Sequence, residues 1–260
     1  MGLWDGPVVA VPVFDQASRS PDPVVELRQY TLHPGQRDTL IEIFDREFVE
    51  SQEDVGMRVI GQFRDLDNPD RFVWLRSFSD MTTRAHALAS FYGGPVWKTH
   101  GPAANATMID SDNVLLLRPV GPPTAFPILD GRRPPADATV RPSSLITATL
   151  CYLPTAPNEH FLRYVEGDVL PVVAAAGAEP IALMETESTT NTFPALPVRE
   201  GEHVVAWFSR FDSQDAYASH REHLAETGDW RDRIVPELMK HVISEPEVLR
   251  LEPTSRSALR

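Results

Sequence analysis

VVELRQYTLHPG, from Val24 to Gly35, is the segment from which the fold of this chain can be worked out. It has the composition of a β-strand, in which successive side chains point to opposite faces. One face carries Val24, Glu26, Arg28 and Tyr30, and the other carries Val25, Leu27, Gln29 and Thr31. Neither face has the composition of a freely solvated surface, so we expect other parts of the chain to cover both.

An amphipathic helix is predicted directly after this strand. Pro34 and Gly35 interrupt the extended run, and apolar residues then recur at helical spacing. The apolar positions are Leu40, Ile41, Phe44 and Phe48, and the acidic positions expected on the opposite face are Asp38, Glu42, Asp45 and Glu50.

A hairpin and two further helices follow. Residues 57–64 and 72–78 are rich in apolar and aromatic side chains and flank turn residues at 65–71, so they predict a β-hairpin. Asp80 is suited to cap a helix that ends near Phe91, because glycine and proline at 93–95 interrupt it. Pro95 then fits the first turn of a shorter helix that runs to about Ala106.

A strand at 113–118 completes the order strand, helix, strand, strand, helix, strand, which is the ferredoxin-like arrangement. Seven prolines then lie between Pro119 and Pro142, a density that opposes packed structure and favours a semi-rigid spacer. The same order of elements is predicted again beyond this spacer. Its segments are strands at 145–153, 181–186, 204–211 and 248–251, and helices at 158–176, 213–224 and 230–241.

Aromatic landmarks support an internal repeat. Three pairs lie 133 residues apart, and the first strands align with a smaller separation of 120 through Pro34 and Pro154. The three pairs are Trp74 with Trp207, Phe78 with Phe211 and Trp97 with Trp230. A long loop at 187–202 accounts for the difference. The predicted organisation is a Pro-rich leader (1–23), a first module (24–119), a Pro-rich linker (120–143), a second module (144–253) and a C-terminal tail (254–260).

Composition excludes several classes of function. Lys and Arg number 24 against 37 Asp and Glu, a net charge of −13, which disfavours a partner that is a nucleic acid. A single cysteine, Cys151, excludes an internal disulfide and fits a reducing compartment. The apolar run from Val8 to Phe14 is short and follows Asp5, so it matches neither a signal peptide nor a membrane span. We expect a soluble, cytoplasmic protein without a membrane partner.

The segments ELRQYTLHPG, VWLRSFSD and FYGGPVW together resemble the NIPSNAP family, whose modules belong to the dimeric α+β barrel superfamily. The resemblance covers residues 24–119 well and the second module more loosely. It implies that two ferredoxin-like units pair their antiparallel sheets into a barrel, here within one chain, as a monomeric pseudo-dimer or a homodimer. The superfamily includes cofactor-independent monooxygenases, isomerases, cyclases, haem enzymes and stress proteins, so membership selects no reaction.

The candidate site lies on the first strand and its neighbour. In a ferredoxin-like sheet the first and third strands are adjacent, so Arg28 and Arg76 should project into one space between sheet and helices. Glu26 would neutralise one guanidinium, and a bound carboxylate, enolate or phenolate would neutralise the other. Tyr30 beside them is a candidate proton donor or base. The alternative is a purely structural ion pair between Glu26 and Arg28, capped by Tyr30.

Other candidates are weaker. His100, one turn beyond Trp97, is a candidate general base, although an exposed helix histidine is the commoner role. Trp97 and Trp230 are expected to pack their helices against the sheets. His220 and His223 stand three residues apart but lack further ligands, so no metal is predicted.

The two modules are predicted to differ in function. Aligning Pro34 with Pro154 places Ile146, Ala148 and Leu150 opposite Glu26, Arg28 and Tyr30, and Ser209 opposite Arg76. The second module would then have an apolar face and serve mainly as a barrel partner.

Two hypotheses follow. The first is a cofactor-independent enzyme that holds a small apolar or aromatic molecule in the cavity of the first module and acts on it by proton transfer, isomerisation, cyclisation or oxygenation. The second is a non-catalytic protein that binds a carboxylate or haem-like ligand or serves in assembly. No phosphate-binding loop, serine-hydrolase elbow or Cys-x-x-Cys pair is present, so no cofactor is predicted.

Overall fold

The computed structural model describes residues 14, 19–20, 22–128 and 133–260. Most of the predicted leader, residues 1–23, and residues 129–132 of the predicted linker lie outside the described residues. Within the described part of the chain, no helix is long and apolar enough to cross a membrane.

Each half of the chain forms one ferredoxin-like module. The first consists of β1 (Val24–Leu32), α1 (Arg37–Ile43), η1 (Phe44–Phe48), α2 (Val49–Glu53), β2 (Arg58–Asp65), β3 (Arg71–Phe78), α3 (Met81–Gly93), α4 (Pro95–Asn105) and β4 (Met108–Pro119). After the short turn η2 (Pro122–Thr124), the second consists of β5 (Leu145–Tyr152), α5 (Glu159–Tyr164), η3 (Val165–Val169), α6 (Leu170–Ala175), β6 (Glu179–Thr186), β7 (Val204–Phe211), α7 (Gln214–Glu226), η4 (Trp230–Ile234), α8 (Val235–Leu238) and β8 (Glu247–Pro253).

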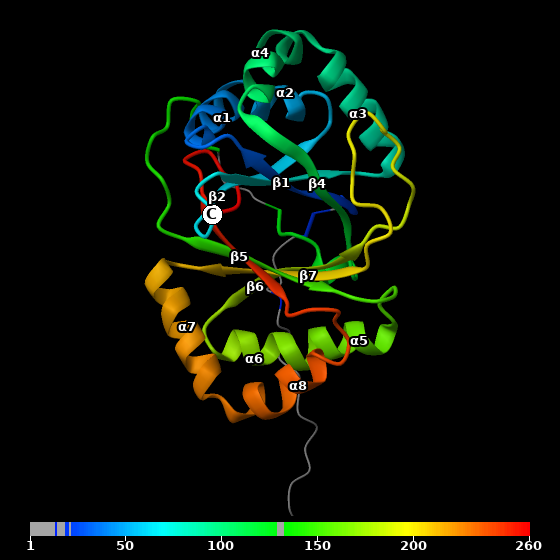
Figure 1. Ribbon diagram of the computed structural model, residues 1–260, viewed down its shortest axis with the longest axis vertical. Helices are drawn as coiled ribbons and strands as arrows, with labels where there is room; N and C mark the ends of the chain where they lie inside the picture. The colour runs from blue at the N-terminus through cyan, green and yellow to red at the C-terminus, as the bar shows by residue number, and fades with distance from the viewer. Residues whose placement is uncertain (1–13, 15–18, 21, 129–132) are drawn as a thin grey trace, which may run out of the picture.

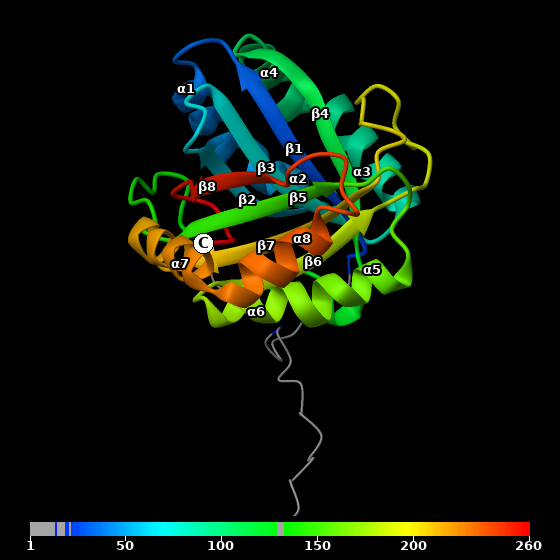
Figure 2. The same cartoon turned by 60° about the horizontal axis from the view of Figure 1, so that its bottom comes forward.

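The two sheets close into one antiparallel barrel within a single chain, as predicted. Its strand order is β1-β3-β2-β8-β5-β7-β6-β4, so β2 pairs with β8 and β4 pairs with β6 where the modules meet. The helices of the first module cover one side of the molecule and those of the second cover the opposite side (Figures 1 and 2). Each module therefore has an inner space facing the barrel and an outer space between its sheet and its helices.

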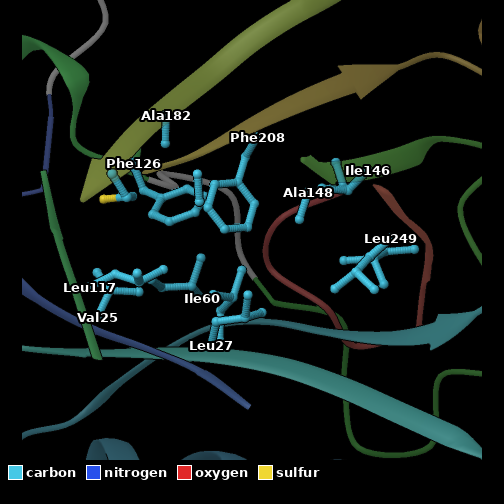
Figure 3. Close-up of a cluster of buried hydrophobic side chains, with 14 of the residues drawn as sticks. Val25, Leu27, Ile60, Leu117, Phe126, Ile146, Ala148, Ala182, Phe208 and Leu249 are labelled. Atoms are coloured by element: carbon cyan, nitrogen blue, oxygen red, sulfur yellow. The ribbon is translucent and has the colours of Figure 1, made fainter. Parts of the chain in front are cut away.

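Apolar side chains fill the barrel interior. Val25 and Leu27 of β1 point inward, together with Ile146 and Ala148 of β5 (Figure 3). Phe126 lies between the sheets against Phe208, with ring centroids 4.9 Å apart. The expectation that the Pro-rich linker opposes packing is therefore wrong at 124–126, because all three residues are buried and Phe126 belongs to the barrel core. The predicted tail also contributes, since Leu259 is 3% exposed and belongs to the same core.

The helices of both modules contain π-helical segments at matching places. η1 and η3 begin 121 residues apart, and each interrupts the first helix of its module. A π-turn adds a residue to the helical turn and so rotates the faces that follow. Asp45, predicted to lie opposite the apolar stripe, is buried instead, since it stands four residues after Ile41 and so lies beside that stripe. It accepts a hydrogen bond from Gln62 Nε2 at 3.0 Å.

Candidate functional site

Four charged residues form a cluster between the first sheet and its helices, which we call the arginine cluster: Glu26, Arg28, Arg76 and Arg84. Glu26 Oε2 accepts hydrogen bonds from Arg28 Nη1 at 2.8 Å and from Arg76 Nε at 2.6 Å. Glu26 Oε1 accepts one from Arg84 Nε at 2.6 Å. All four side chains are at most 1% exposed. The predicted meeting of Arg28 and Arg76 in one space is thus confirmed.

Tyr30 completes the surroundings of Arg28. Its hydroxyl accepts a hydrogen bond from Arg28 Nε at 2.9 Å, while Arg28 Nη2 reaches the Ser111 carbonyl at 3.5 Å. The indole of Trp74 lies beneath both guanidinium groups, 5.6 Å from Arg28 and 4.8 Å from Arg76. Arg28 therefore has a partner for every nitrogen, as the structural alternative requires.

Arg84 is the member that sequence reasoning missed. It lies on α3, on the same buried face as Ala87, Leu88 and Phe91. Those spacings of three, four and seven residues are the signal that could have revealed it, because a charged residue within an apolar helical stripe needs a buried partner.

The cluster holds more positive than negative charge. Three guanidinium groups surround one carboxylate, and among the described residues no second acidic side chain forms an ion pair with any of them. Burial alone would raise the pKa of Glu26, but Arg76, Arg28 and Arg84 outweigh it and hold that pKa far below its usual range. Nη2 of Arg76 and Nη2 of Arg84 are buried without a hydrogen-bond partner.

His100 does not join this cluster. It lies on α4, with its side chain 36% exposed, and its Nε2 is 3.5 Å from Glu47 Oε2. Its role as a general base, like the catalytic roles of Glu26, Arg28, Tyr30 and Arg76, stays a prediction.

The predicted match between the modules is wrong by one residue. β1 pairs with β3 through Val24 and Phe78, and β5 pairs with β7 through Leu145 and Phe211. Ile146, Ala148 and Leu150 consequently point into the barrel. The positions that correspond to Glu26, Arg28 and Tyr30 are Thr147, Thr149 and Cys151, because a shift of one residue exchanges the faces of a strand. The outer face of the second sheet is therefore partly polar.

That outer face borders a cavity of about 480 Å³, which we call the β5–β7 cavity. Its floor is formed by the sheet and its walls by the helices of the second module. Apolar and aromatic side chains line most of it: Val173, Trp207, Phe211, Tyr217, Leu224, Trp230, Val235, Leu238, Met239 and Val248. The first module has the arginine cluster at the equivalent place.

A few polar groups also reach the β5–β7 cavity. Thr147 and Ser209 are paired across β5 and β7, and the Ser209 hydroxyl is buried without a hydrogen-bond partner. His220 of α7 lies 3.2 Å from the Ala176 carbonyl through Nδ1. A carbonyl only accepts, so Nδ1 carries the proton and Nε2 is the free acceptor of the neutral ring. Burial lowers the pKa of His220, which keeps the ring neutral.

Other reactive groups are poorly placed for chemistry. Burial raises the pKa of Cys151 to about 12, so its thiol is not an available nucleophile at neutral pH. In the described ranges, no group of three or more His, Cys, Asp or Glu side chains is arranged to hold a metal ion.

Comparison with known proteins supports the fold. Residues 25–122 match the NIPSNAP family model, so the first module is a NIPSNAP domain. No curated protein matches the chain. An anthrone oxidase-like protein of known structure is 14% identical, with 92% of this chain and 93% of that chain covered and a TM-score of 0.59. A candidate monooxygenase from Fusobacterium nucleatum is 9% identical, with 90% of this chain and 93% of that chain covered and a TM-score of 0.53. A NIPSNAP family protein from Agrobacterium tumefaciens is 20% identical and covers 40% of this chain, with 93% of its own length matched and a TM-score of 0.36.

Proposed function

We propose that this protein is an enzyme that binds a small, largely apolar or aromatic molecule in the β5–β7 cavity and moves a proton to or from it. The observation that carries this proposal is the cavity itself. Its volume of about 480 Å³ falls within the range of roughly 300–1,000 Å³ that is common for small-molecule sites, and most of its lining is apolar, with Arg221 and Glu245 as its charged members.

His220 is the proposed general base. Its Nδ1–H is directed to the Ala176 carbonyl, which fixes the ring and leaves Nε2 to accept a proton from a bound molecule. A positioned base of this kind contributes roughly 10²- to 10⁴-fold to a rate. The Ser209 hydroxyl would donate a hydrogen bond to an oxygen of the ligand and so stabilise the charge that deprotonation creates there.

Anthrone is a suitable probe, because two structural neighbours are named for oxidation chemistry and one of them for this molecule. Loss of a proton from its methylene carbon gives an enolate that is stabilised by aromaticity. Reaction of that enolate with molecular oxygen would yield anthraquinone and water, with two hydrogen atoms leaving the carbon skeleton. The aromatic walls of the cavity, Trp207 and Trp230 among them, suit a flat ring system.

The test is exchange of the methylene hydrogens of anthrone with deuterated water under anaerobic conditions. We expect the unaltered protein to catalyse this exchange. His220→Gln should lower the exchange rate by roughly 10²- to 10⁴-fold. Anthrone should still quench tryptophan fluorescence in that variant. His223→Gln is the matched control, since His223 is exposed on the same helix, and it should keep full activity.

Unchanged exchange in His220→Gln would contradict the proposed base. Saturable binding without exchange in the unaltered protein would instead indicate a binding protein.

A further inference from the structure

The arginine cluster lacks an anion for its charge. Glu26 offsets one of its three guanidinium groups, and the other oxygens that the cluster contacts belong to neutral groups. Buried charges without a counter-charge are costly, so an additional anion would be strongly favoured there.

Two unused donors lie at the position where such an anion would bind. In a guanidinium group, Nε–H and one Nη2–H point the same way along one edge. Arg76 and Arg84 both direct Nε to Glu26, one to each carboxylate oxygen, and in both the neighbouring Nη2 has no partner. Both free donors therefore lie beside the Glu26 carboxylate.

A loop from the other module covers this place. Residues 187–203, which we call the crossing loop, connect β6 to β7 and run beside α3 of the first module (Figure 1, yellow). Asn191 Oδ1 accepts a hydrogen bond from Arg84 Nη1 at 2.9 Å, and Thr192 Oγ1 donates one to the Met81 carbonyl at 2.9 Å. Phe193 stacks on Tyr92 with ring centroids 6.2 Å apart. The loop thus supplies Arg84 with a neutral oxygen.

The crossing loop also rests on the first module through Phe193, Leu196 and Val198, which are only partly buried. It has no regular secondary structure, and its backbone bonds to β4 are Glu187 N to Leu116 O and Arg199 N to Val114 O, both 2.9 Å. A hollow of about 490 Å³ lies along its two ends, bordered by Leu115 and Leu116 of β4. No residue from 187 to 203 is fully buried, and irregular segments of this kind open at a lower free-energy cost than core elements do.

We propose that the arginine cluster is a binding site for a small monocarboxylate, which enters when the crossing loop opens and takes the place of Asn191 on Arg84. A carboxylate offers two coplanar oxygens to the guanidinium edges, and its charge-assisted hydrogen bonds are stronger than those of the Asn191 amide. One negative charge would also halve the excess positive charge of the cluster.

The experiment is calorimetric titration of the full chain with benzoate and acetate at constant ionic strength, with chloride as the comparison anion. We expect one benzoate per chain. Arg84→Met should weaken binding by about tenfold or more, because it removes charge-assisted hydrogen bonds. Asn191→Ala should strengthen binding, since it removes the competing oxygen. A purely structural role of this contact would not produce that gain.

Arg221→Met is the control, because Arg221 lines the β5–β7 cavity. It should leave benzoate affinity unchanged. The proposal is overturned by an absence of saturable binding, by equal affinity for chloride, by weaker binding in Asn191→Ala, or by loss of binding in Arg221→Met alone. The last outcome would place the ligand in the β5–β7 cavity. Asn191 lies on a surface loop, so its variant tests the site even where Arg84→Met fails to fold.

Discussion

Two buried carboxyl groups of the first module have pKa values shifted in opposite directions. Burial raises the pKa of Asp45 to about 6, and hydrogen bonds from Thr254 and Gln62 together with the charge of Arg256 offset only part of that rise. Burial also acts on Glu26, but three guanidinium groups more than reverse it. The number and distance of the cationic partners therefore decide in which direction burial leaves each pKa.

Asp45→Asn should raise stability above pH 6 and flatten its dependence on pH. The folded protein holds the Asp45 proton up to about pH 6, whereas the unfolded chain releases it near 4. Stability from this group is therefore complete below about pH 4 and is lost as pH rises through 6. The loss at pH 7.5 is about 3 kcal/mol from a shift of about two units. Urea unfolding of both proteins at pH 4.5 and 7.5 measures it.

Asp54→Asn is the control for this comparison, because Asp54 is exposed at the end of α2. Its unfolding free energy should follow that of the unaltered protein at both pH values. Equal pH dependence of Asp45→Asn and the unaltered protein would show that folding does not raise the pKa of Asp45.

At the level of elements, the sequence predicted the strands and helices but not their alignment between modules. Proline at 34 and 154 suggested a separation of 120, whereas the strand pairing, the π-helical segments and the bulges at Ile60 and Ile181 all give 121. Strand alternation was enough to place Glu26, Arg28 and Tyr30 on one face. The β5–β7 cavity was missed because a one-residue error hid Thr147 and Thr149, and because cavities depend on how helices pack.

Gly61→Ala should destabilise the protein by about 1–3 kcal/mol, as overpacking of a core does. Gly61 follows the bulge in β2, and an added Cβ would lie 2.4 Å from Cζ of Phe63, which is fully buried in the barrel. The equivalent place in β6 is occupied by Ala182, with Met184 where Phe63 stands. The flexible methionine leaves room that the rigid ring does not.

Phe63→Met in the Gly61→Ala background should therefore recover part of the loss, and a double-mutant cycle of urea unfolding measures the coupling. Gly167→Ala is the matched control, since nothing lies within 4 Å of an added Cβ there. It should be neutral or slightly stabilising, as alanine favours a helix by up to roughly 1 kcal/mol over glycine. If the effects of Gly61→Ala and Phe63→Met are additive, the Phe63 ring is not the neighbour that the added methyl group displaces.

In the whole molecule, the closed barrel has an outer space on each side, one in each module, and the two spaces have different contents. The first holds the arginine cluster and the second holds the β5–β7 cavity, while the interior is closed by Phe126 and Leu259. Hydrophobic patterning and the family resemblance together predicted the closed barrel. They did not predict that Phe126 and Leu259 fill the barrel interior, because both residues lie in short irregular segments that carry no periodic signal.

Removal of residues 254–260 should lower the free energy of unfolding by at least about 3 kcal/mol, the scale of losing a large apolar side chain from a core. Leu259 belongs to the barrel core, and its backbone N–H donates to the Ile60 carbonyl at 2.8 Å. Arg256 is 2% exposed and hydrogen-bonds to the Asp45 carbonyl, the Pro134 carbonyl and Glu50. Far-UV circular dichroism during urea unfolding measures the change.

Tryptophan fluorescence distinguishes how the truncated barrel fails. Trp74 reports on the first module and Trp207 on the second, and both are buried against their sheets. Because β2 pairs with β8 and β4 with β6, opening one seam exposes the edges of both modules. We therefore expect fluorescence and circular dichroism to change together in a single shifted transition. Two separate transitions would show that the modules unfold independently and that the tail, not strand pairing, couples them.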